Sequence, residues 1–278
     1  MIFYYFKILN IIQFCNVFQI KEFLVTLDTD LKRGVSSIDS ILGLCMYFGL
    51  SFSRVGCDFR PLMVDVFINV ISNNFQQSIL RATKNFERNI ERYTLINKNH
   101  PGVPWKTKGD DPIQPPDSLI EFFPLAEYLN QVLSAFNELR LCCPVAIVKD
   151  VVRYLEESLV VISKHILLLY TQERQAFSVN SKDAFTRFCM CFADDLVPYL
   201  QKCIHVIFPP SVVAAHVGIN VYSLQKDGLS FMDQAAIVEP IKHLLPVKVE
   251  VVPNDLIRED QSDENNLETG EAKESPGV

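Results

Sequence analysis

Two close pairs of cysteines are the residues of this chain whose type and spacing most suggest chemistry. Cys142 and Cys143 are adjacent ahead of Pro144, and Cys189 and Cys191 form the second pair. Thiolates grouped in this way bind zinc or carry out dithiol redox reactions. Structural zinc sites, however, are usually built from C-x₂₋₄-C or H-x₃₋₅-H units, and neither occurs in this sequence. A thiol or metal enzyme is therefore the alternative hypothesis, and we expect the four thiols to pack as small apolar side chains.

The predicted helices also separate these thiols. Pro144 suits the first turn of a helix, which places Cys142 and Cys143 in a tight connection between two long antiparallel helices. Adjacent helical residues point about 100° apart and therefore do not converge on one ion. Residues two apart, such as Cys189 and Cys191, are expected on opposed sides of a helix. Together with Arg140, the residues Cys142, Cys143 and Pro144 form what we call the turn signature.

Other candidates for catalysis are weaker. His165 and His205 are embedded in apolar segments, and neither is near a nucleophile in a recognised motif. Asp194 and Asp195 are adjacent, but paired acids on a helix most often form a solvated face. A glycine-rich phosphate loop does not occur in the sequence. We therefore predict no catalytic, cofactor-binding or metal-binding residues, and a protein that is not an enzyme.

Composition and charge favour a helical globular protein without nucleic-acid partners. Apolar residues make up 49% of the 278 residues, and 20 Phe stand against only 10 Gly. Most of the net charge of −7 lies in residues 254–278, which hold eight acidic and two basic side chains. The rest of the chain has 24 basic and 25 acidic residues. A nearly neutral body has no basic stripe for phosphate contacts. The eight cysteines lack small-scaffold spacing, which suits a reducing compartment.

The first residues raise a membrane hypothesis. The longest uncharged run, residues 8–20, is shorter than the roughly 17 to 25 residues of a spanning helix and contains Asn10, Gln13, Asn16 and Gln19. We expect a first helix with a buried aromatic face, or an atypical start from a truncated gene model. A membrane-inserted helical protein anchored through residues 1–27 is the alternative.

Helical periodicity dominates the rest of the chain. Helices are predicted over residues 37–56, 61–93, 118–141 and 181–207, with short ones at 211–217 and 233–245. Ser118 and Glu121 have the spacing of a capping box, and Pro198 is expected to kink its helix. The apolar stretch around Gly49 is expected at the centre of the bundle, where the glycine allows close helix approach or a bend.

A seven-residue apolar repeat is the clearest single pattern. Its members are spaced alternately by four and three residues and are called the seam here: Val148, Val152, Leu155, Leu159, Ile162, Ile166 and Leu169. Such a stripe requires a neighbouring helix along its length. We predict that the seam serves either internal helix packing or a partner helix.

The expected organisation has five parts. They are an atypical segment at 1–21, a first helical bundle portion at 22–96, a proline-rich linker at 97–117, a second helical bundle portion at 118–245 and a disordered acidic tail at 246–278. The linker is expected to be disordered or to dock through Trp105. The fold class is all-α, an elongated helical bundle of long antiparallel helices.

Three stretches carry a family resemblance: LGLCMYFGLSFSRVGCDFRP at 42–61, AFNELRLCCPVA at 135–146 and DLVPYLQKCIHVIFPP at 195–210. In this order they resemble the carboxy-terminal part of subunit 8 of the conserved oligomeric Golgi complex, over residues 22 to 245. Full members of that family have a long helical amino-terminal half that this sequence lacks. Contacts made by that half are therefore not transferred to this chain.

The resemblance implies a bundle of the tethering-complex helical-rod type and a non-catalytic subunit without a cofactor. It implies peripheral association with the cytosolic face of the Golgi membrane, where such a complex tethers vesicles in retrograde intra-Golgi transport and maintains Golgi structure and glycosylation. It also implies subunits 5, 6, 7 and 1 as partners, with SNARE proteins and small GTPases as further contacts.

Overall fold

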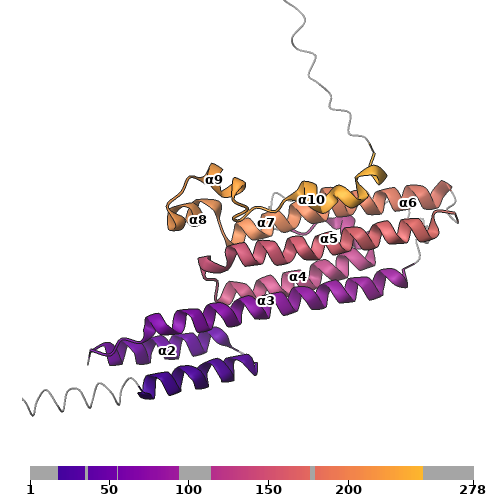
Figure 1. Cartoon of the computed structure of the whole chain (residues 1–278). Helices are drawn as coiled ribbons and strands as arrows, with labels where there is room; N and C mark the ends of the chain where they lie inside the picture. Colours follow the sequence, from indigo (N-terminus) through magenta and orange to yellow (C-terminus); the bar gives the residue numbers. More distant parts are fainter. Residues whose placement is uncertain (1–17, 35–36, 55, 94–113, 176–178, 247–278) are drawn as a thin grey trace, which may run out of the picture. The chain divides into compact units, whose positions relative to one another are not determined.

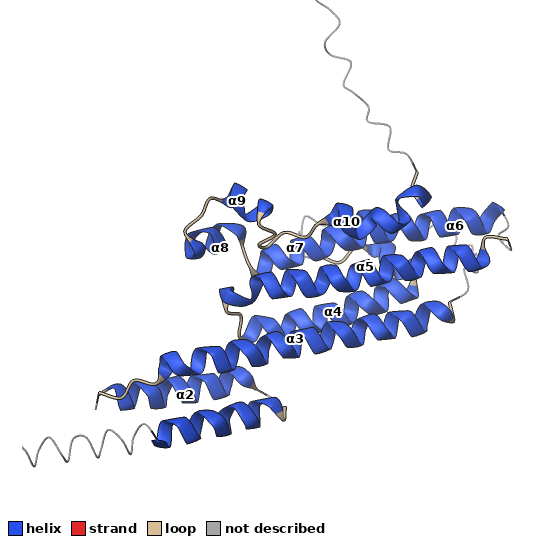
Figure 2. Cartoon of the chain, viewed as in Figure 1, coloured by secondary structure: helices blue, strands red, loops and turns tan. Residues whose placement is uncertain are grey.

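The structure, a computed structural model, describes residues 18–34, 37–54, 56–93, 114–175 and 179–246. Within these ranges every regular element is helical, and no strand is present (Figure 2). The fold class is therefore confirmed as an all-α helical bundle. Predictions for Trp105, for residues 1–17 and for the tail from 247 lie outside the described residues, and the five-part organisation stays a prediction.

The first described helices agree with the sequence. A helix over residues 18–32 is followed by α2 (Ile38–Ser53) and the long α3 (Arg60–Glu91) (Figure 1). Ser37 is the N-cap residue of α2, Arg54 is its C-cap residue, and Gly56 has a φ of +82°, which glycine adopts without strain. Pro61 lies in the first turn of α3, where its missing N–H needs no acceptor.

Three long helices form the centre of the fold. These are α3, α4 (Phe123–Leu141) and α5 (Val148–Glu173), and α3 packs against both of the others (Figure 1). The apolar face of α3 supplies a continuous buried row: Met63, Phe67, Val70, Ile71, Phe75, Ile79, Ala82, Phe86 and Ile90. The short helix η2 (Val145–Ile147) directly precedes α5.

A π-helical turn interrupts the next helix. The chain runs through α6 (Val179–Met190), the π-helical η3 (Cys191–Leu196) and α7 (Val197–Ile207). Pro198 lies in the first turn of α7, and because it has no N–H, it cannot donate to a carbonyl in an α-helical ladder. Val197 instead donates its N–H to the carbonyl of Phe192, five residues back. The distortion predicted at Pro198 is thus present as a π-turn just before it.

Short helices complete the described chain. They are α8 (Pro210–Val217), α9 (Val221–Lys226), α10 (Gln234–Val238) and η4 (Glu239–Leu244). The last two pack on α5. Helix α9 was not predicted, although Asn220 caps it by accepting a hydrogen bond from the N–H of Tyr222.

The predicted capping box at Ser118 is wrong. Residues Asp117–Glu121 form the 3₁₀ helix η1, and α4 begins afterwards at Phe123, with Pro124 in its first turn. Proline fixes φ at a helical value and needs no N–H acceptor, so it is a suitable first-turn residue. The side chains of Ser118 and Glu121 are used in contacts to other elements.

Candidate protein interaction site

The seam of α5 lies in the core. Its seven residues are between 0 and 8% exposed: Val148, Val152, Leu155, Leu159, Ile162, Ile166 and Leu169. Helix α5 packs against α3 of the same chain and against α10 and η4. A role of the seam toward a partner subunit stays a prediction.

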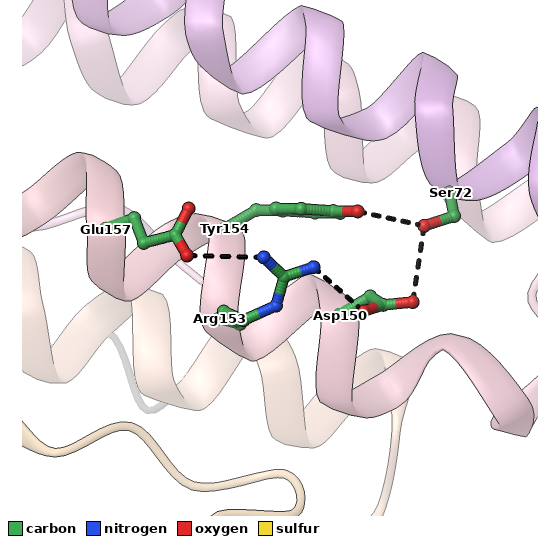
Figure 3. Close-up of polar contacts among 5 residues, drawn as sticks. All are labelled: Ser72, Asp150, Arg153, Tyr154 and Glu157. Carbon is green, nitrogen blue, oxygen red and sulfur yellow. Dashed lines mark hydrogen bonds and ion pairs between the residues drawn. The ribbon is translucent and has the colours of Figure 1, made fainter.

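A polar cluster joins α3 to the start of α5 (Figure 3). Ser72 of α3 donates from Oγ to Oδ2 of Asp150, and its Oγ is also 3.4 Å from the hydroxyl of Tyr154, which then acts as donor. Arg153 contacts Asp150 at 3.0 Å and Glu157 at 3.2 Å, and its guanidinium lies 4.4 Å from the ring centre of Tyr154. The Arg153 ion pairs are about half exposed and contribute at most about 1 kcal/mol each.

A second, fully buried row of hydroxyl groups links three helices. Thr83 of α3 donates to the carbonyl of Ile79 at 2.8 Å, so its Oγ1 accepts from Ser158 of α5, 2.6 Å away. Ser158 in turn accepts from Tyr128 of α4, whose hydroxyl is 2.7 Å away. Each proton therefore has an acceptor, and burial raises the pKa of Tyr128 well above its ordinary value. The row fixes the mutual register of α3, α4 and α5.

Cys142, Cys143 and Pro144 of the turn signature lie between α4 and α5, as predicted, and Arg140 lies in the last turn of α4. The expectation that Pro144 lies in the first turn of the second helix is wrong, because Pro144 has an extended ψ of 132° and is the N-cap residue of η2. Cys142 donates its backbone N–H to Leu139, and both adjacent cysteines are half-buried against the core. Burial, and secondarily the neighbouring Cys142, raises the pKa of Cys143 to about 12. Arg140 is exposed. Thiols with raised pKa values are poor nucleophiles at neutral pH.

The second cysteine pair is buried, as expected for cysteines that pack as small apolar side chains. Cys189 is 0% exposed and Cys191 is 3% exposed. Cys189 lies in α6, and Cys191 is the first residue of the π-helical η3. Burial raises the pKa of each thiol to about 12. Across the described ranges no group of three or more metal-ligating side chains converges.

The π-turn and the preceding α6 are both tied to η1 by polar contacts. Ser118 donates from Oγ to Oδ2 of Asp195 at 2.6 Å, and Arg187 forms an ion pair with Glu121 at 2.9 Å. The sulfur of Cys191 also lies 3.7 Å from Oγ of Ser118. Ser118 and Glu121, which resembled a helix cap in sequence, thus hold two separate segments together.

Helix α2 departs most from the sequence prediction. The stretch around Gly49 was expected at the centre of the bundle, yet only Cys45 and Gly49 of α2 are buried. Five of its large apolar residues are between 43 and 68% exposed: Leu44, Met46, Tyr47, Phe48 and Leu50. We call these five residues the α2 patch. An apolar helix of this kind is normally covered on both sides, and here one side faces solvent.

The fold and these surfaces define a class of protein: an all-α bundle whose main candidate site, in the part that the structure describes, is an apolar helix surface. The model of the Dor1-like family matches residues 11–84. Conserved oligomeric Golgi complex subunit 8 of Drosophila melanogaster is 47% identical over 249 residues, covering 87% of this chain. The proteins of that name from Homo sapiens and Bos taurus are each 44% identical over 82% of this chain. Over most of its length the chain is thus similar to proteins named conserved oligomeric Golgi complex subunit 8.

The match covers only part of each relative. It spans 43% of the Drosophila melanogaster protein and 39% of the Homo sapiens protein. No solved structure matches the chain. Among the described helices, none combines the length and the apolarity needed to cross a membrane.

Proposed function

We propose that the chain is a non-catalytic subunit of a Golgi vesicle-tethering complex and acts through contacts between helices. The observation that carries this proposal is its 47% identity, over 87% of its length, to a protein named as a subunit of the conserved oligomeric Golgi complex. The all-α bundle supports it, because packed amphipathic helices supply both a rigid core and helix faces for partners.

The finer proposal concerns place and partners. We infer peripheral association with the cytosolic face of the Golgi membrane and a role in retrograde intra-Golgi transport, Golgi structure and glycosylation. The proposed partners are subunits 5, 6, 7 and 1 of the complex, SNARE proteins and small GTPases. These assignments follow from the family and extend to a chain that spans about two fifths of the relatives it matches.

Affinity purification of the tagged full chain from cells tests the proposal. We expect mass spectrometry to identify other subunits of the Golgi complex, at levels well above those retrieved by an unrelated tagged helical protein. Retrieval of none of them, from cells in which the complex is intact, would refute the proposed function.

Carbonate extraction of the same cells tests the alternative of an anchor in residues 1–27. A peripheral subunit is released by carbonate, whereas a chain inserted through its first residues stays in the membrane pellet. We expect release. Retention that disappears when residues 1–17 are deleted would favour the membrane-inserted protein instead.

A further inference from the structure

The α2 patch has the spacing of a helix-docking surface. Leu44, Tyr47 and Phe48 lie at positions i, i+3 and i+4 and are 60, 68 and 52% exposed. The rings of Tyr47 and Phe48 make an edge contact, with centroids 6.1 Å apart. Anchors at this spacing are typical of one helix that binds along another, and aromatic residues are enriched among strongly contributing interface positions.

The patch is kept outward by packing on the opposite face of α2. Cys45 and Gly49 are buried there. A Cβ atom at Gly49 would lie 2.3 Å from Cγ of Arg60, so the two helices approach closely at this point. Turning α2 to bury the patch would break this approach and expose Cys45. Helix α2 therefore has two apolar faces: one, with Cys45 and Gly49, is buried, and the other is the exposed patch.

Charge defines the chemistry of the occupant. No charged residue lies between Asp39 and Arg54 in the sequence, a stretch that is about 20 Å long as a helix. A basic or acidic partner would lose its hydration there without gaining an ion pair. Interfacial membrane helices usually combine an apolar face with a Lys- and Arg-rich polar face, which α2 lacks. An uncharged apolar helix face complements the patch best.

The helix over residues 18–32, which precedes α2, leaves the patch residues exposed. Residues 1–33 contain neither glycine nor proline, the residues that most readily reverse a chain, so the sequence does not favour a hairpin that returns residues 1–17 to α2. The Dor1-like match at 11–84 includes the patch. The patch thus lies in the part of the chain that is similar to the family model.

We propose that the α2 patch docks the apolar face of a helix from another subunit of the complex. This proposal rests on the proposed function and adds the surface through which the chain binds. The partner helix is expected to carry large aliphatic residues at i, i+3 and i+4 over about two turns. Binding buries Leu44, Tyr47 and Phe48 together.

Paired lysine substitutions in the full chain test the proposal. In the test variant, Tyr47→Lys is combined with Phe48→Lys. The matched control combines Ile120→Lys with Tyr222→Lys, at residues that are 74 and 85% exposed outside the patch. Both variants change two exposed apolar side chains to lysine, and both should keep the helicity and melting temperature of the wild type. We expect the test variant to retrieve about tenfold less of one partner subunit, because lysines would be desolvated in an apolar contact. The control variant should retrieve wild-type amounts.

The outcomes separate this inference from the proposed function. If the wild-type chain retrieves the complex and the folded test variant retrieves it equally, the docking proposal is wrong while the function stands. If the wild type retrieves no subunit, the function itself fails. Two further outcomes, each with subunit binding unchanged, would overturn the proposal. If the variant loses self-association measured by light scattering, the patch binds a second copy of the chain. If it loses flotation with phosphatidylcholine and phosphatidylserine vesicles, the patch binds a membrane.

Discussion

Gly49 of α2 lies directly against the side chain of Arg60 at the start of α3. A Cβ at Gly49 would be 2.3 Å from Cγ and 3.1 Å from Cδ of Arg60. Arg60 cannot easily move aside, because its Nε and Nη2 donate to Asp58 at 2.9 and 2.6 Å. This ion pair also lowers the pKa of Asp58 to about 2. The expectation that Gly49 allows a close helix approach is therefore confirmed.

Two glycines of α2 allow a matched test of this contact. At Gly43 no atom lies within 4 Å of an added Cβ, so Gly43→Ala should raise stability by up to about 1 kcal/mol through helix propensity. Gly49→Ala should gain nothing or lose stability, because the new methyl group displaces Arg60. Thermal unfolding of both variants checks this. Equal stabilisation by the two substitutions would contradict the close approach.

The buried hydroxyl row predicts an unequal effect of removing its members. Ser158→Ala leaves the hydroxyl of Tyr128 without its acceptor in a fully buried place, and we expect a loss of about 1–3 kcal/mol in the free energy of unfolding. Adding Tyr128→Phe should restore part of this loss, since the unpaired hydroxyl is then gone. Chemical denaturation of the single and double variants measures the coupling. Strictly additive losses would show that the row does not act as a unit.

The seam predicts a large difference between two leucines of α5. Leu159 is 0% exposed and Leu168 is 50% exposed. Leu159→Asp places an unpaired charge in the core and should cost more than about 3 kcal/mol, enough to unfold a marginal domain. Leu168→Asp should change stability by less than about 0.5 kcal/mol. Circular dichroism distinguishes the two, and normal helicity and melting of the Leu159 variant would argue against the described core.

Glu156 predicts a pH dependence of stability. Burial raises its pKa in the folded state, although its Oε1 accepts a hydrogen bond from the N–H of Asp233 at 2.6 Å. An acid whose pKa is higher in the folded than in the unfolded state binds its proton more tightly when the chain is folded. Its contribution to the free energy of unfolding is therefore present at low pH and is lost as pH rises through the folded pKa. Glu156→Gln should therefore stabilise the chain at pH 7 and have little effect below the unfolded pKa, near pH 4. Melting temperatures that differ from the wild type by the same amount at both pH values would contradict this.

A thiol or metal enzyme would need reactive cysteines, whereas the structure predicts unreactive ones. Because burial raises the pKa of Cys189 and Cys191 to about 12, we expect both to resist iodoacetamide at pH 8 until the chain is unfolded. Mass spectrometry of labelled peptides checks this. Rapid labelling of the folded chain, or stoichiometric zinc lost when the four paired cysteines are replaced by alanine, would revive a thiol or metal site.

Much of the fold follows from sequence because periodicity reports local geometry. The bounds of α3 and α5 and the burial of the seam depend on apolar spacing that a single helix already displays. The cap of α2 and the left-handed Gly56 are likewise local signals. Elements of this kind are predictable without knowledge of their neighbours.

The remaining features depend on contacts between distant residues. Ser118 resembled a capping residue, but its hydroxyl binds Asp195. The sulfur of Cys191 lies 3.7 Å from Oγ of the same Ser118, a contact between distant residues that a helical wheel does not represent. The exposure of Tyr47 and Phe48 was not predictable, since an all-apolar helix indicates burial without indicating whether the same chain supplies the cover.

Cross-linking mass spectrometry of the complex purified through the full chain tests the central claim most directly. Lys21 and Lys32 lie on the helix over residues 18–32 that precedes α2 and carry the amines closest to the patch in sequence on that side. We predict that lysine-reactive reagents join one or both to a lysine of another Golgi complex subunit, and that the Tyr47→Lys, Phe48→Lys variant loses this link. Links that run only within this chain or to its own copies would contradict a helical subunit that docks through α2.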